Sequence, residues 1–211
     1  MQFSDDVLAF LRDVPAVPFC PLTSEGAARA TEDLWTRAPL AEAMGLVVLN
    51  DTNDSNHYCL VTRGPAAGAV MFVPHDDSAS FAFPSLEVLR DVMVRAAALG
   101  TEIWDIEPAA PVPHADQPPL RDHIRAILAG DRADAANSIG MLMPLLDPED
   151  IGTLRLVASD HDFLVREIAA RFMACAPRPS QMPVLEVLAT DRYPQVQRPA
   201  AAARRALGHA L

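Results

Sequence analysis

Two short segments contain the residues whose types could do chemistry. His75-Asp76-Asp77 places an imidazole beside carboxylates, a combination that serves acid–base catalysis or metal binding, and His161-Asp162 repeats the His-Asp pair far along the chain. A hydrolytic metal site needs more converging ligands, and the sequence has no HExxH motif. A small metal-dependent hydrolase using His75 and Asp76 is therefore the third-ranked hypothesis. Solvated polar residues at a strand end are the preferred interpretation.

The segment from Asp51 to His57 begins like a calcium-binding loop. An EF-hand needs Gly at its sixth position and a bidentate Glu at its twelfth, where this chain has Asn56 and Thr62. Asn and Asp also favour turns, so we predict a turn between two strands. No nucleophile elbow, CxxC, P-loop or GxGxxG motif occurs either. We therefore expect no metal, no cofactor and no enzymatic activity.

Four aspartates fall in these predicted turns: Asp51, Asp54, Asp76 and Asp77. If the turns meet at one edge of a sheet, the carboxylates form an acidic surface for a basic partner, because complementary charge speeds encounter and suppresses wrong partners. The alternative is an ordinary set of solvated turns. We predict that these four residues bind a protein partner.

The overall charge argues against nucleic acid as the partner. The formal net charge is -11, and residues 1–104 account for -8 of it, so the surface would repel a phosphate backbone. There is no apolar run of about 18 residues, and the N-terminus is acidic where a secretory signal would be basic. We expect a cytoplasmic protein without a membrane segment. The three cysteines are too scattered for a disulfide framework, and we expect them to be reduced and mostly buried.

The first hundred residues predict helices around a small antiparallel sheet. Ser4 and Thr31 are candidate helix caps, the second for a helix that runs to Met44 with an interruption at Pro39. Ser85 is expected to cap a further helix from Leu86. Short β-branched or aromatic runs separated by turn residues predict a meander of strands. These runs are 46–49, 58–62, 69–73 and 80–83.

Beyond this region the chain predicts a linker and then helices. Five prolines fall within residues 105–119, which we interpret as a linker between domains at 1–104 and 120–211. In the second domain, Val157-Ala158-Ser159-Asp160 recurs as Leu188-Ala189-Thr190-Asp191, 31 residues later. An earlier copy ends at Asp131. A period near 30 with two helices per unit indicates solenoid repeats.

The residues from 163 to 173 predict a helix with one face toward the core. Val165, Ile168, Ala169, Phe172 and Met173 follow helical spacing, which predicts one buried face. Phe163, Phe172 and Met173 could instead line a peptide groove, but at this spacing a core role is preferred. A further helix start is predicted at Asp147-Pro148-Glu149, with proline in the first turn.

Both parts resemble known families. Residues 46–49, 58–62 and 68–73, His75-Asp76 and the passage from Phe81 to Leu86 resemble the SUKH superfamily of cell-wall assembly regulators and bacterial toxin-immunity proteins. Asp160, Val165-Arg166 and Ala169-Ala170 resemble HEAT-like repeats, although Gln197 and Pro199 replace Arg166 and Ile168 in the last repeat. These resemblances imply an α+β domain with a small antiparallel sheet and flanking helices, followed by an all-α array of helix hairpins.

Binding is the function that these observations favour. The SUKH resemblance implies an immunity protein that neutralises a toxin, which would be a basic domain, by stoichiometric binding. A HEAT-type scaffold that recognises a peptide or protein through residues 120–211 is the alternative.

Overall fold

The computed structural model describes residues 3–15, 19–50, 56–76, 79–106, 112–130 and 134–208. These residues form an α+β protein with one small antiparallel sheet and a helical C-terminal region, as predicted. The chain divides into two compact units, Met1–Ala109 and Ala110–Leu211. Each unit is described by itself.

The sheet of the first unit is a meander with the strand order β1-β2-β3-β4. The strands are β1 (Leu46–Val48), β2 (His57–Val61), β3 (Val70–Val73) and β4 (Ser80–Phe83), all antiparallel to their neighbours. Gly64 and Gly68 both have positive φ in the connection from β2 to β3, which is a backbone conformation that glycine adopts without steric cost. The sequence-predicted strands are confirmed to within a residue or so at their ends.

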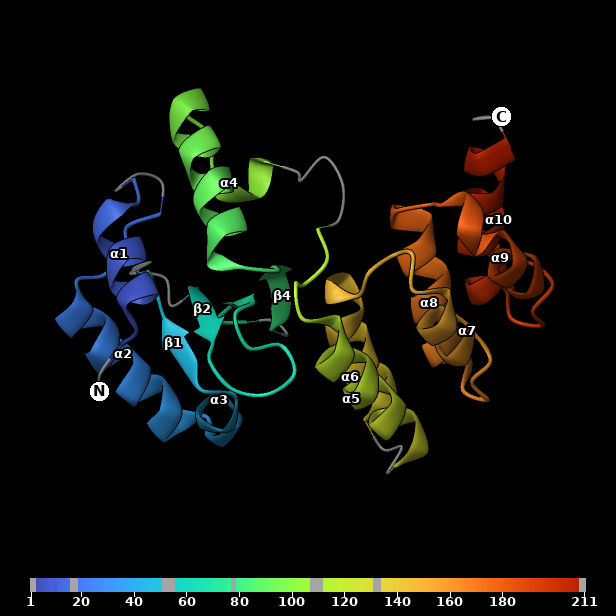
Figure 1. Ribbon diagram of the computed structural model, residues 1–211, viewed down its shortest axis with the longest axis horizontal. Coiled ribbons are helices and arrows are strands. Elements are labelled where there is room, and N and C mark those ends of the chain that lie inside the picture. The colour runs from blue at the N-terminus through green and yellow to red at the C-terminus, as the bar shows by residue number, and fades with distance from the viewer. Residues whose placement is uncertain are drawn as a thin grey trace. The chain divides into compact units, whose positions relative to one another are not determined.

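Helices flank this sheet (Figure 1). They are α1 (Asp5–Asp13), α2 (Ser24–Arg37), α3 (Pro39–Met44) and α4 (Leu86–Leu99), followed by a 3-10 turn, Ile103–Asp105. The interruption predicted at Pro39 is confirmed, because α2 ends at Arg37 and Pro39 opens α3. The predicted start at Thr31 is wrong: Thr23 caps α2, accepting a hydrogen bond from the Gly26 amide, and Thr31 lies inside the helix.

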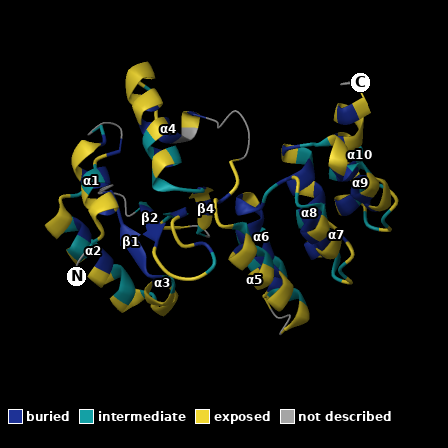
Figure 2. Cartoon of the chain, viewed as in Figure 1, coloured by how far each residue is buried: buried dark blue, intermediate teal, exposed yellow. Residues whose placement is uncertain are grey.

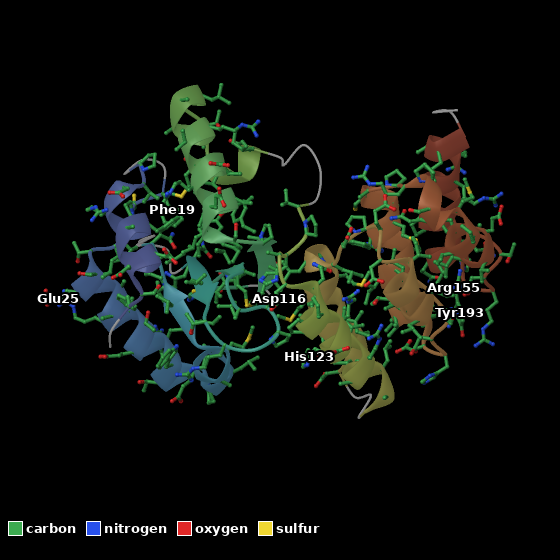
Figure 3. All side chains as sticks on the ribbon, viewed as in Figure 1. Phe19, Glu25, Asp116, His123, Arg155 and Tyr193 are labelled. Carbon is green, nitrogen blue, oxygen red and sulfur yellow. The ribbon has the colours of Figure 1, made fainter. Side chains whose placement is uncertain are left out.

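Aromatic and aliphatic side chains form the core between α1, α4 and one face of the sheet. Phe19, labelled in Figure 3, belongs to this core, and its ring centroid lies 5.9 Å from that of Phe10 and 5.6 Å from that of Tyr58. Tyr58 in turn packs against Phe72 and Phe83. Figure 2 shows buried residues concentrated on the strands and exposed residues on the outer sides of the helices. Burial of so much apolar surface is the main force that holds the sheet to its helices.

The second unit consists of helices in two layers. One layer contains α5 (Gln117–Ala129), α7 (Ile151–Ala158) and α9 (Met182–Leu188), and the other contains α6 (Ala135–Leu142), α8 (Phe163–Cys175) and α10 (Pro194–Gly208). Neighbours pack both within a layer and between layers (Figure 1). Two 3-10 turns, Met143–Leu145 and Pro179–Gln181, lie between helices.

The helix boundaries of this unit refine the predictions. Asp150, not Asp147, caps α7, and its carboxylate accepts a hydrogen bond from the Thr153 amide at 3.0 Å. Pro118 and Pro119, which the sequence places in the linker, lie in the first turn of α5. His114, also in that segment, is buried, and its amide donates to the carbonyl of Leu145. Residues from His114 onward therefore pack as part of the second unit.

The 31-residue repeat has equivalent contacts in its two copies. Asp160 and Asp191 each accept, through a carboxylate oxygen, a hydrogen bond from the amide two residues further on. Arg166 donates to the carbonyl of Asp160, and Gln197, its counterpart, donates to the carbonyl of Asp191. The repeat in the sequence thus corresponds to a repeated loop structure.

Candidate protein-binding surface

The register of the sheet brings two polar turns to the same end of the first unit. His57, the first residue of β2, pairs with Val73, the last residue of β3. The residues that precede His57 and those that follow Val73 therefore leave the sheet side by side. One hydrogen bond joins them directly, because the His75 amide donates to the side-chain oxygen of Asn56 at 2.9 Å.

Asn50 fixes the other end of the first turn. Its side chain is only 1% exposed, and its amide oxygen accepts a hydrogen bond from the Tyr58 amide at 2.6 Å. The carbonyl of Asn50 also lies 3.4 Å from Nδ1 of His57, and Asn50 forms an isolated bridge with Pro21. Asn50 and Asn56 thus anchor both ends of the connection between β1 and β2. Sequence reasoning assigned them only a turn preference, because their partners depend on strand register.

The four predicted partner-binding residues belong to these two turns. Of the four, Asp76 lies within the described residues. Its side chain is 91% exposed, and its carboxylate accepts a hydrogen bond from Nδ1 of His75 at 2.6 Å. Asp51, Asp54 and Asp77 lie outside the described residues, although Asn50, Asn56 and Asp76 beside them are described. The connections that carry all four aspartates therefore start and end at the same end of the sheet.

The His75–Asp76 pair is open to solvent. The side chain of His75 is 63% exposed, so no described residue encloses the pair in a pocket that would shield a proton transfer from water. His161 contacts Asp160 at 3.6 Å on the second unit and is likewise exposed. Among the described residues, no group of three His, Cys, Asp or Glu side chains is arranged to hold a metal ion.

The cysteines are free, but they are less buried than predicted. Cys59 is buried in β2, and burial raises the pKa of its thiol to about 12, so it stays protonated and unreactive. The pKa of Tyr58 is also raised to about 12, first by burial and then by the charge of Glu102. Cys20 and Cys175 are exposed, which corrects the expectation of mostly buried cysteines. Cys20 lies in the loop before α2, and Cys175 is the last residue of α8.

The second unit contains a charged and aromatic cluster that sequence reasoning did not assign. Arg166 donates to both carboxylate oxygens of Asp191, at 2.6 and 3.1 Å, and both side chains are nearly buried. These bonds lower the pKa of Asp191 and raise that of Arg166. Tyr193, which is labelled in Figure 3, stacks on Phe163 with ring centroids 4.5 Å apart, and the guanidinium carbon of Arg166 lies 5.8 Å from the centroid of the Tyr193 ring.

This cluster joins two loops of the helical layers. Arg166 lies on α8, and its side chain bonds Asp191 in the loop before α10. Phe163, the first residue of α8, stacks on Tyr193 of the same loop. Phe172 and Met173 are buried in the core as predicted, and Phe163 is half-buried against Tyr193. The 31-residue repeat could have suggested the Arg166–Asp191 contact, since Arg166 donates both to Asp160 and to Asp191, which occupy equivalent positions of successive repeats.

Comparison with protein-family models, curated proteins and solved structures finds no match to this chain. Among the described helices, none has the length and apolar character needed to cross a bilayer. The surfaces of the two units are therefore the evidence for function.

Proposed function

We propose that the protein is a non-enzymatic binding module that docks a basic protein through the aspartate-bearing end of its sheet. The observation that carries this proposal is the hydrogen bond from the His75 amide to the side chain of Asn56. The pairing of His57 with Val73 in the sheet is what brings these two residues together. These contacts hold Asn56 beside His75, and the connections to which Asp51, Asp54, Asp76 and Asp77 belong run through these two residues. A surface of this sign attracts a cationic partner and steers its approach.

The resemblance of residues 1–104 to the SUKH superfamily supports a specific form of this function. The partner would be a basic toxin domain, and the protein would act in the cytoplasm as its immunity protein by covering the toxin stoichiometrically. The charge of -8 over residues 1–104 supports such pairing, since long-range attraction matters most when a partner must be captured before it acts.

The test compares two variants with equal changes of charge. The first replaces the four aspartates by asparagine: Asp51→Asn, Asp54→Asn, Asp76→Asn and Asp77→Asn. The control neutralises exposed acids on the flanking helices: Glu25→Gln, Glu42→Gln, Glu87→Gln and Asp91→Asn. Partners are captured with the wild-type chain, identified, and tested for association kinetics over about 25 to about 300 mM salt, where screening changes most.

We expect the aspartate variant to associate more slowly at low salt, by about 10-fold, and to lose most of the salt dependence. The control should keep more of the association rate and of its salt dependence, because its four acids lie on helices and not in the connections that carry the aspartates. Co-expression with the captured partner, if that partner is toxic, should restore growth with the wild-type chain only. Equal kinetics for the aspartate variant and the wild type would refute the proposal.

A scaffold function of the second unit is the second candidate, favoured by its two layers of helices. HEAT-like repeats would display an extended surface to a peptide or protein. The bonds of Arg166 support this interpretation, because this side chain of α8 connects Asp160 and Asp191, the equivalent loop residues of successive repeats. The resemblance is carried by only a few residues, so this candidate ranks below the first.

A further inference from the structure

The end of the chain has the opposite charge to the whole. No acidic residue follows Asp191, whereas Arg192, Arg198, Arg204 and Arg205 do, in a protein whose formal net charge is -11. Three of these arginines lie on α10, and all four are exposed. A local concentration of cations on an acidic protein creates a surface with its own partner preference.

These arginines also differ in their contacts from most of the other described arginines of the second unit. Five described arginines elsewhere in the unit pair with carboxylates, and Arg155 is the exception; the five are Arg121, Arg125, Arg166, Arg171 and Arg178. Within the described residues, Arg198, Arg204 and Arg205 have no carboxylate partner. Arg192 lies over the ring of Tyr193, with 4.8 Å from its guanidinium carbon to the ring centroid. The guanidinium groups on α10 thus remain open to an incoming anion.

Two of the unpaired arginines line a groove between α9 and α10. The groove has a volume of about 530 Å³, and it is lined by Met182, Glu186, Ala201, Arg204, Arg205 and Gly208. Ala201 and Gly208 lie on α10 at a spacing of seven residues, and their small size leaves the groove open. Met182 is half-buried and gives the groove an apolar wall. Its flexible side chain can adapt to different apolar groups.

We propose that this groove binds an acidic peptide segment of another protein. Carboxylates of the segment would pair with Arg204 and Arg205, and an aliphatic side chain between them would contact Met182 and Ala201. Two observations favour a peptide over a nucleic acid: Glu186 lies in the groove, and the chain as a whole is strongly acidic. Both repel a continuous phosphate backbone, while a peptide needs only local charge. The inference concerns the second unit and does not rest on the function proposed for the first.

The experiment uses the full chain and a labelled, end-capped peptide that alternates Glu with Leu, followed by fluorescence anisotropy. We expect binding in roughly the micromolar range, as for a short charged peptide in an open groove, weakening as salt rises. The variant with Arg204→Glu and Arg205→Glu should bind about 10-fold or more weakly. The control with Arg29→Glu and Arg95→Glu makes the same change of charge on exposed helices of the first unit and should bind like the wild type.

Further probes separate charge, apolar contact and other occupants. A peptide that alternates Glu with Ser should bind more weakly than the Leu peptide, and Met182→Ser should reduce that difference. Circular dichroism confirms that each variant is folded. Binding that is unaffected by the Arg204/Arg205 changes would overturn the proposal. So would tighter binding of a single-stranded oligonucleotide, or salt-sensitive dimers of the wild type that the same two changes dissociate, since a second copy would then occupy the groove.

Discussion

Thr31 illustrates how a single hydroxyl connects a helix to the sheet. Its side chain is fully buried in α2, and its oxygen accepts a hydrogen bond from the Val48 amide of β1 at 2.9 Å. The sequence suggested a helix cap here, because a threonine followed by acids looks the same in both settings. Only the register of α2 on the sheet decides between them, and that register depends on contacts distant in sequence.

Replacing Thr31 by valine should therefore destabilise the first unit. Valine has the shape of threonine but cannot accept a hydrogen bond, so Thr31→Val leaves a buried amide unpaired at a cost of about 1–3 kcal/mol. Thr31→Ser keeps the hydroxyl, so it should lose less stability than the valine variant if the hydrogen bond contributes more than the packing of the methyl group. Urea denaturation followed by circular dichroism measures both; a valine variant as stable as the wild type would disprove the role of this bond.

Asp191 gives a prediction about pH. Its folded-state pKa is lowered, chiefly by hydrogen bonds from Arg166, below the ordinary value of about 3.9. The pair thus stabilises the fold above about pH 4, and this contribution is lost as the pH falls through the folded pKa. Asp191→Asn should cost about 2–4 kcal/mol at neutral pH, because it leaves a nearly buried guanidinium without its counter-ion.

The control for this prediction is Asp122→Asn, which removes an exposed partner of Arg125 and should cost less than about 1 kcal/mol. Stability measured from pH 7 to acid should show the gap between wild type and Asp191→Asn narrowing below about pH 4. A gap that stays constant through this range would mean that the pair is not the source of the effect.

At the scale of elements, Gly45 determines how α3 passes into β1. It has φ of +61°, and an added Cβ would lie 2.3 Å from Oγ1 of Thr62, whose hydroxyl donates to the Gly45 carbonyl. Gly45→Ala should cost about 2–4 kcal/mol, from the left-handed backbone and the displaced hydrogen bond. Gly100→Ala at φ +66°, where nothing lies near the added Cβ, should cost only about 1 kcal/mol. Thermal or urea denaturation of the two variants compares them, and equal losses would exclude the clash at Gly45.

The elements themselves were largely predictable from the sequence. Strand-forming runs bounded by Gly, Pro and Asn predicted β1 to β4, because these turn residues interrupt pairing wherever they occur. The start of α2 and the cap of α7 were missed. Each helix start offers more than one capping residue, Thr23 and Thr31 for α2 and Asp147 and Asp150 for α7, and tertiary packing determines which one is used. Pro199, which replaces Ile168 in the last repeat, lies inside α10, and this helix begins five residues earlier at Pro194.

The candidate site was predictable only in part. Turn chemistry suggested where the four aspartates lie along the chain, but the bonds of Asn50 and Asn56 depend on how β2 pairs with β3. The groove between α9 and α10 was missed altogether. It arises from the packing of two helices around small residues, and no motif in the sequence marks it.

At the scale of the whole molecule, the net charge is distributed unevenly along the chain. Residues 1–104 carry -8 of the formal net charge of -11, and the charged side chains after Asp191 are all arginines. The two proposed surfaces therefore attract opposite partners: a basic protein at the sheet end and an acidic peptide at the groove. Each set of charge changes should leave the other surface's binding intact, so failure of one proposal is distinguishable from failure of the other.

The association rate of the captured partner with the four-aspartate variant, measured against salt, tests the central claim most directly. The account predicts slower association at low salt and a nearly flat salt dependence for that variant, with the Glu25, Glu42, Glu87 and Asp91 control remaining closer to the wild type. A wild-type rate and salt dependence in the four-aspartate variant would contradict it.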